Sequence, residues 1–178
     1  MKNLVYPFTE KAVRSLRAGD TVSITGTIVT GRDRLHKYFA EGHPLPVDFR
    51  DGALYHCGPV VVGNAADGWR VVSAGPTTSV RENAYEPDFI AKTGVRLIIG
   101  KGGMDAATHA AMQRAGAVYI QAVGGAGAFY ADAVKEVEGV ELLEEFGAAE
   151  ALWRFRVEGF TGVVAMDSHG NTLFHPDL

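Results

Sequence analysis

The sequence predicts an α/β domain with mixed sheets, and three observations support that class. At 178 residues and 47% hydrophobic composition, the chain is long enough to bury one complete core. The second half repeats an order of apolar strand, glycine loop and helix, which is typical of parallel βαβ units. In the first half, apolar and polar side chains alternate as they do in strands. We therefore expect a single domain over residues 1–178.

The first half is expected to hold short elements. Thr9 is a suitable N-cap for a helix over residues 10–18. Residues 21–30 alternate like a strand, and Gly26 inside them predicts a bulge or a close backbone approach. Residues 32–41 place their apolar side chains on one face, which predicts a helix.

The remaining elements follow from apolar runs separated by glycine. Strands over residues 53–57 and 69–74 are expected on either side of a glycine-containing connection at 63–68, which resembles a hairpin or an extended turn. The second half is more regular. Its expected elements are a strand at 95–99, a helix at 104–115, a strand at 117–123, a helix at 126–134 and strands at 140–143, 153–157 and 162–166.

Charge and hydropathy exclude two classes of partner. The formal net charge of −4 argues against a protein that binds nucleic acid regardless of sequence, because such proteins carry a basic face. No apolar run approaches the roughly 20 residues of a membrane span, and the first residues lack the apolar stretch of a signal peptide. We expect no nucleic acid, no membrane and a cytoplasmic location.

Cys57 is the single cysteine of the chain. It allows no internal disulfide, and alone it cannot hold a structural zinc ion or an iron–sulfur cluster, which need about three or four protein ligands. The histidines lack the HxxxH spacing of a zinc-binding helix. We therefore expect no metal ligand in this chain, so a metal would need other residue types or another chain.

Three junctions between a strand and a helix each carry one cation, in the order Arg32, Arg81 and Lys101. In open α/β sheets, ligands bind beyond the carboxyl ends of strands, where helix N-termini present free amides. If the three loops converge, two guanidiniums and an ammonium suit a small anion with more than one carboxylate. Surface loops also commonly carry such cations, and the sequence leaves the convergence open.

Four further polar side chains are candidates beside these cations. Thr77 and Thr78 are either ordinary turn hydroxyls or groups for proton transfer, although a neutral hydroxyl is a weak base. Asp33 and His36 lie three residues apart at the start of a helix and share a face. They either pair and orient the imidazole or only stabilise the helix.

Two glycine-rich loops are weak signals for a nucleotide. Residues 100–103 (GKGG) do not complete the GxxxxGK[ST] pattern of a phosphate loop. Residues 124–129 (GGAGAF) do not match GxGxxG, and tight packing between a strand and a helix explains these glycines at least as well.

A set of short motifs occurs in one order along nearly the whole chain. Together they closely resemble the β subunit of class I iron–sulfur hydro-lyases, a family that comprises class I fumarase and L(+)-tartrate dehydratase. The motifs are TGT at 25–27, TGRDRLH at 30–36, CGP at 57–59, SAGPTTSVR at 73–81, GKGG at 100–103, GGA at 124–126 and DSHGN at 167–171.

The resemblance implies a fold and a set of partners. The fold is a swivelling three-layer β/β/α domain with mixed sheets, which docks on an α subunit. In that family the α subunit carries a four-iron four-sulfur (4Fe-4S) cluster on three cysteines and leaves one iron open to substrate, so this chain would not ligate the cluster. A dicarboxylate substrate and a β homodimer within an α2β2 assembly are implied as well.

The resemblance also assigns roles by motif position. It implies that Thr77 is the base that acts on the carbon-bound proton. The residues expected to bind substrate are Arg32, Asp33, His36, Thr78, Arg81 and Lys101. Gly31 and residues 80–82 depart from the commonest family pattern, which affects substrate choice more than reaction class.

The expected function is the reversible hydration of fumarate to malate by an enzyme that is active only with its cluster-bearing α subunit. Dehydration of L(+)-tartrate is the near alternative. A non-catalytic module that binds dicarboxylates is the alternative from another class.

Overall fold

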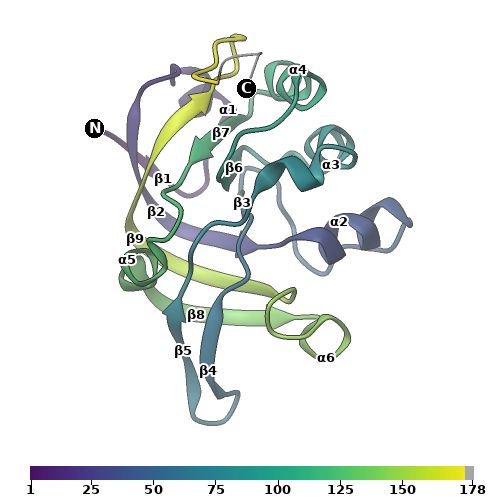
Figure 1. Cartoon of the computed structure of the whole chain (residues 1–178), viewed down its shortest axis with the longest axis vertical. Helices are drawn as coiled ribbons and strands as arrows, with labels where there is room; N and C mark the ends of the chain where they lie inside the picture. Colours follow the sequence, from purple (N-terminus) through teal and green to yellow (C-terminus); the bar gives the residue numbers. More distant parts are fainter. Residues whose placement is uncertain (175–178) are drawn as a thin grey trace.

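The computed structural model describes residues 1–174 (Figure 1). These residues form nine strands, six α-helices and one 3-10 helix, η1. In chain order the elements are β1 (Lys2–Val5), α1 (Glu10–Arg14), β2 (Thr21–Thr30), α2 (Asp33–Ala40), β3 (Ala53–Tyr55), β4 (Val60–Asn64), β5 (Gly68–Ser73), η1 (Ser79–Glu82), α3 (Glu86–Thr93), β6 (Leu97–Gly100), α4 (Ala106–Ala115), β7 (Val118–Gln121), α5 (Gly127–Ala133), β8 (Val134–Glu141), α6 (Leu143–Phe146) and β9 (Leu152–Met166).

Seven strands form one mixed sheet in the order β1-β2-β3-β6-β7-β9-β8, and β9 also pairs with β2. The strands from β1 to β7 in that order are parallel to their neighbours. In contrast, β9 is antiparallel to β2, β7 and β8. Because β9 pairs with both ends of the run from β2 to β7, these five strands close into a ring. The predicted α/β class with a mixed sheet is confirmed, as is the parallel β6–α4–β7 unit.

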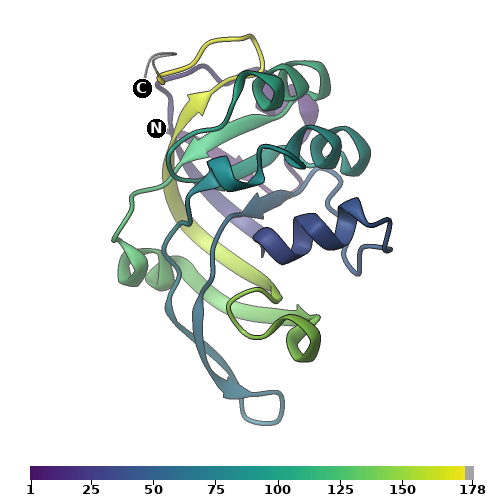
Figure 2. The same ribbon diagram turned by 45° about the vertical axis from the view of Figure 1, so that its right-hand side comes forward.

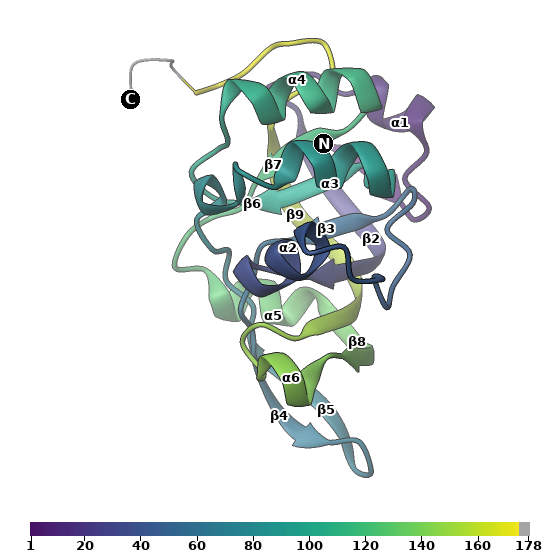
Figure 3. The same ribbon diagram turned by 90° about the vertical axis from the view of Figure 1, so that its right-hand side faces the viewer.

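Alternation along the strands divides the hydrophobic core into two parts. Ile28 and Ile99 belong to one cluster of buried side chains, and their neighbours Val29 and Ile98 belong to a second cluster. The second cluster also contains buried residues of α2, α3 and α4, such as Leu35. Figure 3 shows these three helices side by side along one face of the sheet. Adjacent strand residues therefore anchor the strands on both faces, as expected for parallel strands.

The hairpin of β4 and β5 extends away from the rest of the chain (Figure 2). The expected hairpin partner of β5 was the strand at 53–57, and this expectation is wrong, because β3 pairs with β2 and β6 in the main sheet. The hairpin instead uses Val60–Asn64. Val61, Trp69 and Val71 pack on the core from one face of the hairpin, which accounts for its register.

One strand, β9, occupies the region where two strands were expected. It runs without interruption over 15 residues, and its pairing with β2 continues on both sides of Glu158 and Gly159. These two residues are exposed, so they break the apolar pattern without breaking the backbone ladder. The bulge and the close approach predicted at Gly26 are both present: the register with β9 shifts there, and a Cβ at Gly26 would collide with Tyr6.

Five elements have no counterpart in the sequence prediction, namely β1, β4, η1, α3 and α6. Helix α3 has proline in its first turn and buries Phe89 and Ile90 as its apolar residues, which is a weak helical signal. Over residues 1–174, none of the helices combines the length and the apolar character needed to cross a membrane.

Candidate functional site

Backbone hydrogen bonds bring two of the predicted loops together with the loop that follows β3. The Thr77 amide donates to the His56 carbonyl at 2.7 Å, and the Lys101 amide donates to the Thr77 carbonyl at 3.2 Å. The Ser79 amide returns a bond to the Lys101 carbonyl at 2.9 Å. The segment that carries Thr77 therefore lies between the loops that follow β3 and β6. These are neighbouring parallel strands, so both loops leave the same edge of the sheet.

Arg32 stands at the N-cap position of α2, directly after β2. Its side chain is 20% exposed, and its Nε lies 3.4 Å from Oε1 of Glu150. A Cβ at Gly58 would collide with Nη1 of Arg32, so the guanidinium lies against the loop that follows β3. Glycine at position 58 is thus needed for the close approach of Arg32.

Arg81 lies in η1 and forms an ion pair with Asp33 at the start of α2. The two side chains are 54% and 36% exposed. The possible pairing of Asp33 with His36 is not formed among residues 1–174, because Asp33 binds Arg81 and His36 points to another partner. The contact between Asp33 and Arg81 joins the loop after β2 to the segment that contains Thr77.

Lys101 follows β6 and is partly buried. A Cβ at Gly124 would lie 3.3 Å from its Cδ and 3.7 Å from its Nζ. The glycine loop after β7 therefore allows the lysine side chain to pass close by. Gly127, at the start of α5, is similarly close to Ser73, so close packing explains these glycines without a dinucleotide.

The predicted residues thus lie after β2, β5 and β6, in segments that adjoin the loops after β3 and β7. Arg32, Asp33 and Lys101 are partly exposed, as is Thr77, whereas Thr78 and Arg81 are more open to solvent. His36 is different, because its side chain is fully buried. It lies beneath the loops and does not line the exposed surface.

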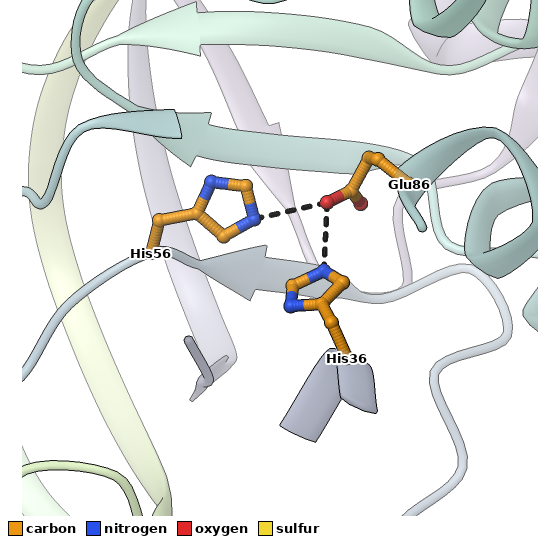
Figure 4. Close-up of side chains that lie close together, drawn as sticks. All are labelled: His36, His56 and Glu86. Carbon is orange, nitrogen blue, oxygen red and sulfur yellow. Dashed lines mark hydrogen bonds and ion pairs between the residues drawn. The ribbon is translucent and has the colours of Figure 1, made fainter. Parts of the chain in front are cut away.

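A cluster of four buried ionisable side chains lies below these loops (Figure 4 shows three of them). It consists of His36 from α2, His56 after β3, Glu82 from η1 and Glu86 from α3, and all four side chains are 0% exposed. Glu86 Oε2 lies 2.7 Å from His36 Nε2 and 3.2 Å from His56 Nε2. Glu82 Oε2 lies 3.2 Å from His36 Nδ1.

Hydrogen bonds extend the cluster and assign its protons. His36 Nδ1 bonds to the Arg32 carbonyl at 2.9 Å, so this nitrogen carries a proton. The Gly103 amide donates to the Tyr119 hydroxyl, which also shares a hydrogen bond with Ser79 Oγ. The Glu86 carboxylate, which can only accept, faces His56 Nε2, so the proton of His56 lies on Nε2 and its Nδ1 accepts from Ser79.

The charges of the cluster follow from burial and pairing. Burial disfavours a charged His36, but Glu86 and Glu82 outweigh it and raise the pKa of His36 to about 9. Burial likewise disfavours a charged Glu86, but His36 and His56 lower the pKa of Glu86 to about 2. Burial raises the pKa of Glu82 to about 8 and lowers the pKa of His56. At neutral pH the cluster therefore holds one ion pair, His36 with Glu86, between two uncharged groups.

The sequence prediction missed His56, Glu82 and Glu86. Glu82 and Glu86 lie four residues apart, a spacing that can place two side chains on one face, but nothing in the pattern indicated burial. The three ligand atoms of His36, His56 and Glu86 lie within 4.8 Å of one another, which is a metal-like arrangement that the sequence spacing did not indicate. In this structure, two of these ligand atoms, His36 Nε2 and Glu86 Oε2, are hydrogen-bonded directly to each other.

Cys57 does not suit an iron–sulfur cluster. Its side chain is buried, and burial raises the pKa of its thiol, so the thiolate that a cluster requires is disfavoured. A cluster also needs further cysteines, and the sequence has none.

The fold and the adjoining loops define an α/β domain with several cations gathered at one edge of its parallel strands. Comparison with known families identifies the family within this class. The family model described as "Fumarase C-terminus" matches residues 2–176, and the chain belongs to this family.

Three curated relatives carry names of two kinds. The chain is 51% identical, over 97% of its length, to a protein named putative fumarate hydratase class I from Geobacillus stearothermophilus. It is 41% identical over 93% of its length to a putative L(+)-tartrate dehydratase subunit beta from Methanocaldococcus jannaschii. It is 40% identical over 97% of its length to the L(+)-tartrate dehydratase subunit beta of Escherichia coli K12. The aligned region covers 33% of the first relative, 87% of the second and 86% of the third.

Proposed function

We propose that this chain is the β unit of a hydro-lyase that interconverts fumarate and malate once it is assembled with a cluster-bearing α unit. The observation that carries the proposal is the grouping of Arg32, Thr77, Arg81 and Lys101 on adjoining loops. The 51% identity to a putative class I fumarate hydratase supports the choice of reaction.

The proposed roles follow from the chemistry of a dicarboxylate. Arg32 and Arg81 would clamp carboxylates with paired hydrogen bonds, and Lys101 would add a point charge. Negative charge develops on the substrate when a proton leaves carbon, and these cations would stabilise it. Asp33 would position Arg81 through their ion pair, with Thr78 beside them. His36 would not contact the substrate directly, because its side chain is buried; it would support the loop of Arg32 through its bond to the Arg32 carbonyl.

Thr77 is proposed as the base that removes the carbon-bound proton in the malate-to-fumarate direction and returns it in hydration. A neutral threonine hydroxyl is a weak base, and nearby cations favour its deprotonated form. When bound, a 4Fe-4S cluster on the α unit would supply a Lewis acid for the hydroxyl group that leaves.

Dehydration of L(+)-tartrate is the second candidate. The observation that favours it is the coverage of the two named β subunits, most of whose length aligns with this chain. Tartrate has one more hydroxyl than malate, and the α unit can make that distinction. The third candidate is not an enzyme: it is a module that binds dicarboxylates without converting them.

The proposal includes an assembly. Two relatives carry the name subunit beta, which supports an α partner for this chain. An α2β2 enzyme with a β homodimer, a three-layer domain that swivels on its partner and a cytoplasmic location complete the proposal.

The experiment is an anaerobic purification of the chain from its native cells, with iron content and turnover of fumarate, malate and tartrate measured together. We expect an iron-rich partner or segment and turnover of fumarate. A preference for tartrate would make L(+)-tartrate dehydration the proposed reaction in place of fumarate hydration. A chain without iron and without turnover that still binds dicarboxylate would replace the enzyme with the binding module.

A further inference from the structure

The buried cluster under the predicted site is unusually costly for a hydrophobic core. The side chains of His36, His56, Glu82 and Glu86 are fully buried, and both carboxylate oxygens of Glu82 lack a hydrogen bond. Glu82 Oε2 does lie 3.2 Å from His36 Nδ1, but that nitrogen is bonded to the Arg32 carbonyl. Buried ion pairs are often no more stabilising than apolar side chains of the same volume. Stability alone therefore does not account for this cluster.

Glu86 occupies the centre of the cluster. One of its oxygens faces both imidazoles, at 2.7 Å from His36 Nε2 and 3.2 Å from His56 Nε2 (Figure 4). The two histidines come from different segments, α2 and the loop after β3. A single carboxylate on α3 thus connects α2 with the loop after β3, and both of these segments border the predicted site.

Further hydrogen bonds join each histidine to the predicted site. His36 bonds to the carbonyl of Arg32, at the start of α2. The carbonyl of His56 accepts from the Thr77 amide, and its ring bonds to Ser79, whose amide bonds to Lys101. His36 has a hydrogen bond at each ring nitrogen, so its ring orientation is fixed. His56 has one ring hydrogen bond, at Nδ1, and its Nε2 faces Glu86. Both rings thereby restrain the backbone to which they are bonded.

We infer that Glu86 is a positioning residue of the proposed active site, holding His36 and His56 so that the loops with Arg32, Thr77 and Lys101 keep their relative placement. This inference rests on the proposed function. The carboxylate does not touch substrate, because it is buried beneath the loops. Glu86 instead affects the positions of Arg32, Thr77 and Lys101. Turnover falls strongly when catalytic groups are displaced by about 1 Å.

The test replaces Glu86 with glutamine in the enzyme assembled with its native partner. Glutamine keeps the volume of the side chain but removes the charge that holds the imidazolium of His36. We expect normal assembly and iron content, and a fall of roughly tenfold or more in kcat/KM. Glu86→Asp keeps an acceptor for the histidines and should recover part of that loss.

A second measurement does not depend on turnover. Amide hydrogen exchange should become faster at Thr77 and Lys101 in the Glu86→Gln chain, because their bonds depend on the held loops. Exchange in β7 and β9 should stay as in the wild type. Asp88→Asn is the matched control: Asp88 is on the same helix, is 73% exposed and pairs only with Lys92 among the described residues. This control should change neither measurement.

Each result decides the inference. Wild-type values of kcat/KM and of exchange at Thr77 and Lys101 in Glu86→Gln would overturn it, as would faster exchange throughout β7 and β9. A stoichiometric metal ion that Glu86→Gln loses would also overturn it, because the three side chains would then be ligands. If the wild-type enzyme turns over no dicarboxylate but the local exchange effect appears, the proposed function fails and the positioning role stands.

Glu86→Gln can also fail to fold. Ser79→Ala then serves, because it removes the bond from His56 to Ser79 and leaves the ion pair of His36 with Glu86 in place. The expected result is again faster exchange at Thr77 and Lys101, and unchanged exchange at both would overturn the inference.

Discussion

Replacing Glu82 with glutamine should change how the stability of this domain depends on pH. Glutamine has nearly the same size and cannot ionise. Burial raises the pKa of Glu82 from its ordinary value of 4.5 to about 8. The folded chain therefore keeps a proton that the unfolded chain releases above pH 4.5. The stability from this proton is complete below pH 4.5 and is lost as the pH rises toward 8.

The size of the effect follows from that difference in pKa. One pKa unit corresponds to about 1.4 kcal/mol, so between pH 5 and pH 8 Glu82 should remove on the order of 4 kcal/mol from the free energy of unfolding. The contribution of His36, whose pKa is raised to about 9, is complete below 6.5 and is also lost as the pH rises. That of Glu86, whose pKa is lowered to about 2, is lost only as the pH falls below 4.5. Both residues remain in the variant, so their contributions largely cancel in the comparison.

The assay is urea unfolding of the wild-type and Glu82→Gln chains at several pH values from 5 to 8. The two free energies of unfolding should be similar at pH 5, and the variant should become more stable than the wild type by several kcal/mol toward pH 8. Asp88→Asn, at an exposed position, should follow the wild type. Parallel curves for wild type and Glu82→Gln across this range would refute the assignment of a buried, protonated Glu82.

Three further predictions concern the site itself. Arg81→Ala should abolish turnover at a cost in unfolding free energy of less than about 1 kcal/mol, because its ion pair with Asp33 is exposed; full activity in a normally assembled variant would remove Arg81 from the site. Thr77→Val should lower kcat more than it weakens dicarboxylate binding, and an unchanged kcat would reject Thr77 as the base. Gly58→Ala should displace Arg32 and raise KM, with a loss of roughly 1–3 kcal/mol in stability measured by urea unfolding; an unchanged KM would show that Arg32 does not bind substrate from this position.

Local patterns were sufficient for much of the fold. The alternation of residues 21–30 predicted β2 with its bounds, because each strand residue faces one of two sides. The predicted strand at 140–143 and the pair of strands at 153–157 and 162–166 were less accurate. There, β8 consists of exposed or half-buried residues, and β9 continues through the exposed Glu158 and Gly159. Backbone pairing holds these residues in strands, and the apolar pattern does not indicate it.

The sequence by itself determined the class of fold, the order of the parallel units and the positions of Arg32 and Lys101 just after a strand, because these depend on residues near one another in the chain. Only the tertiary structure decided that Asp33 binds Arg81 and that His36 lies buried against Glu86, fifty positions further along. Such contacts depend on which strands become neighbours in the sheet. The strand order depends on the packing of the whole core, so a local sequence pattern cannot predict it.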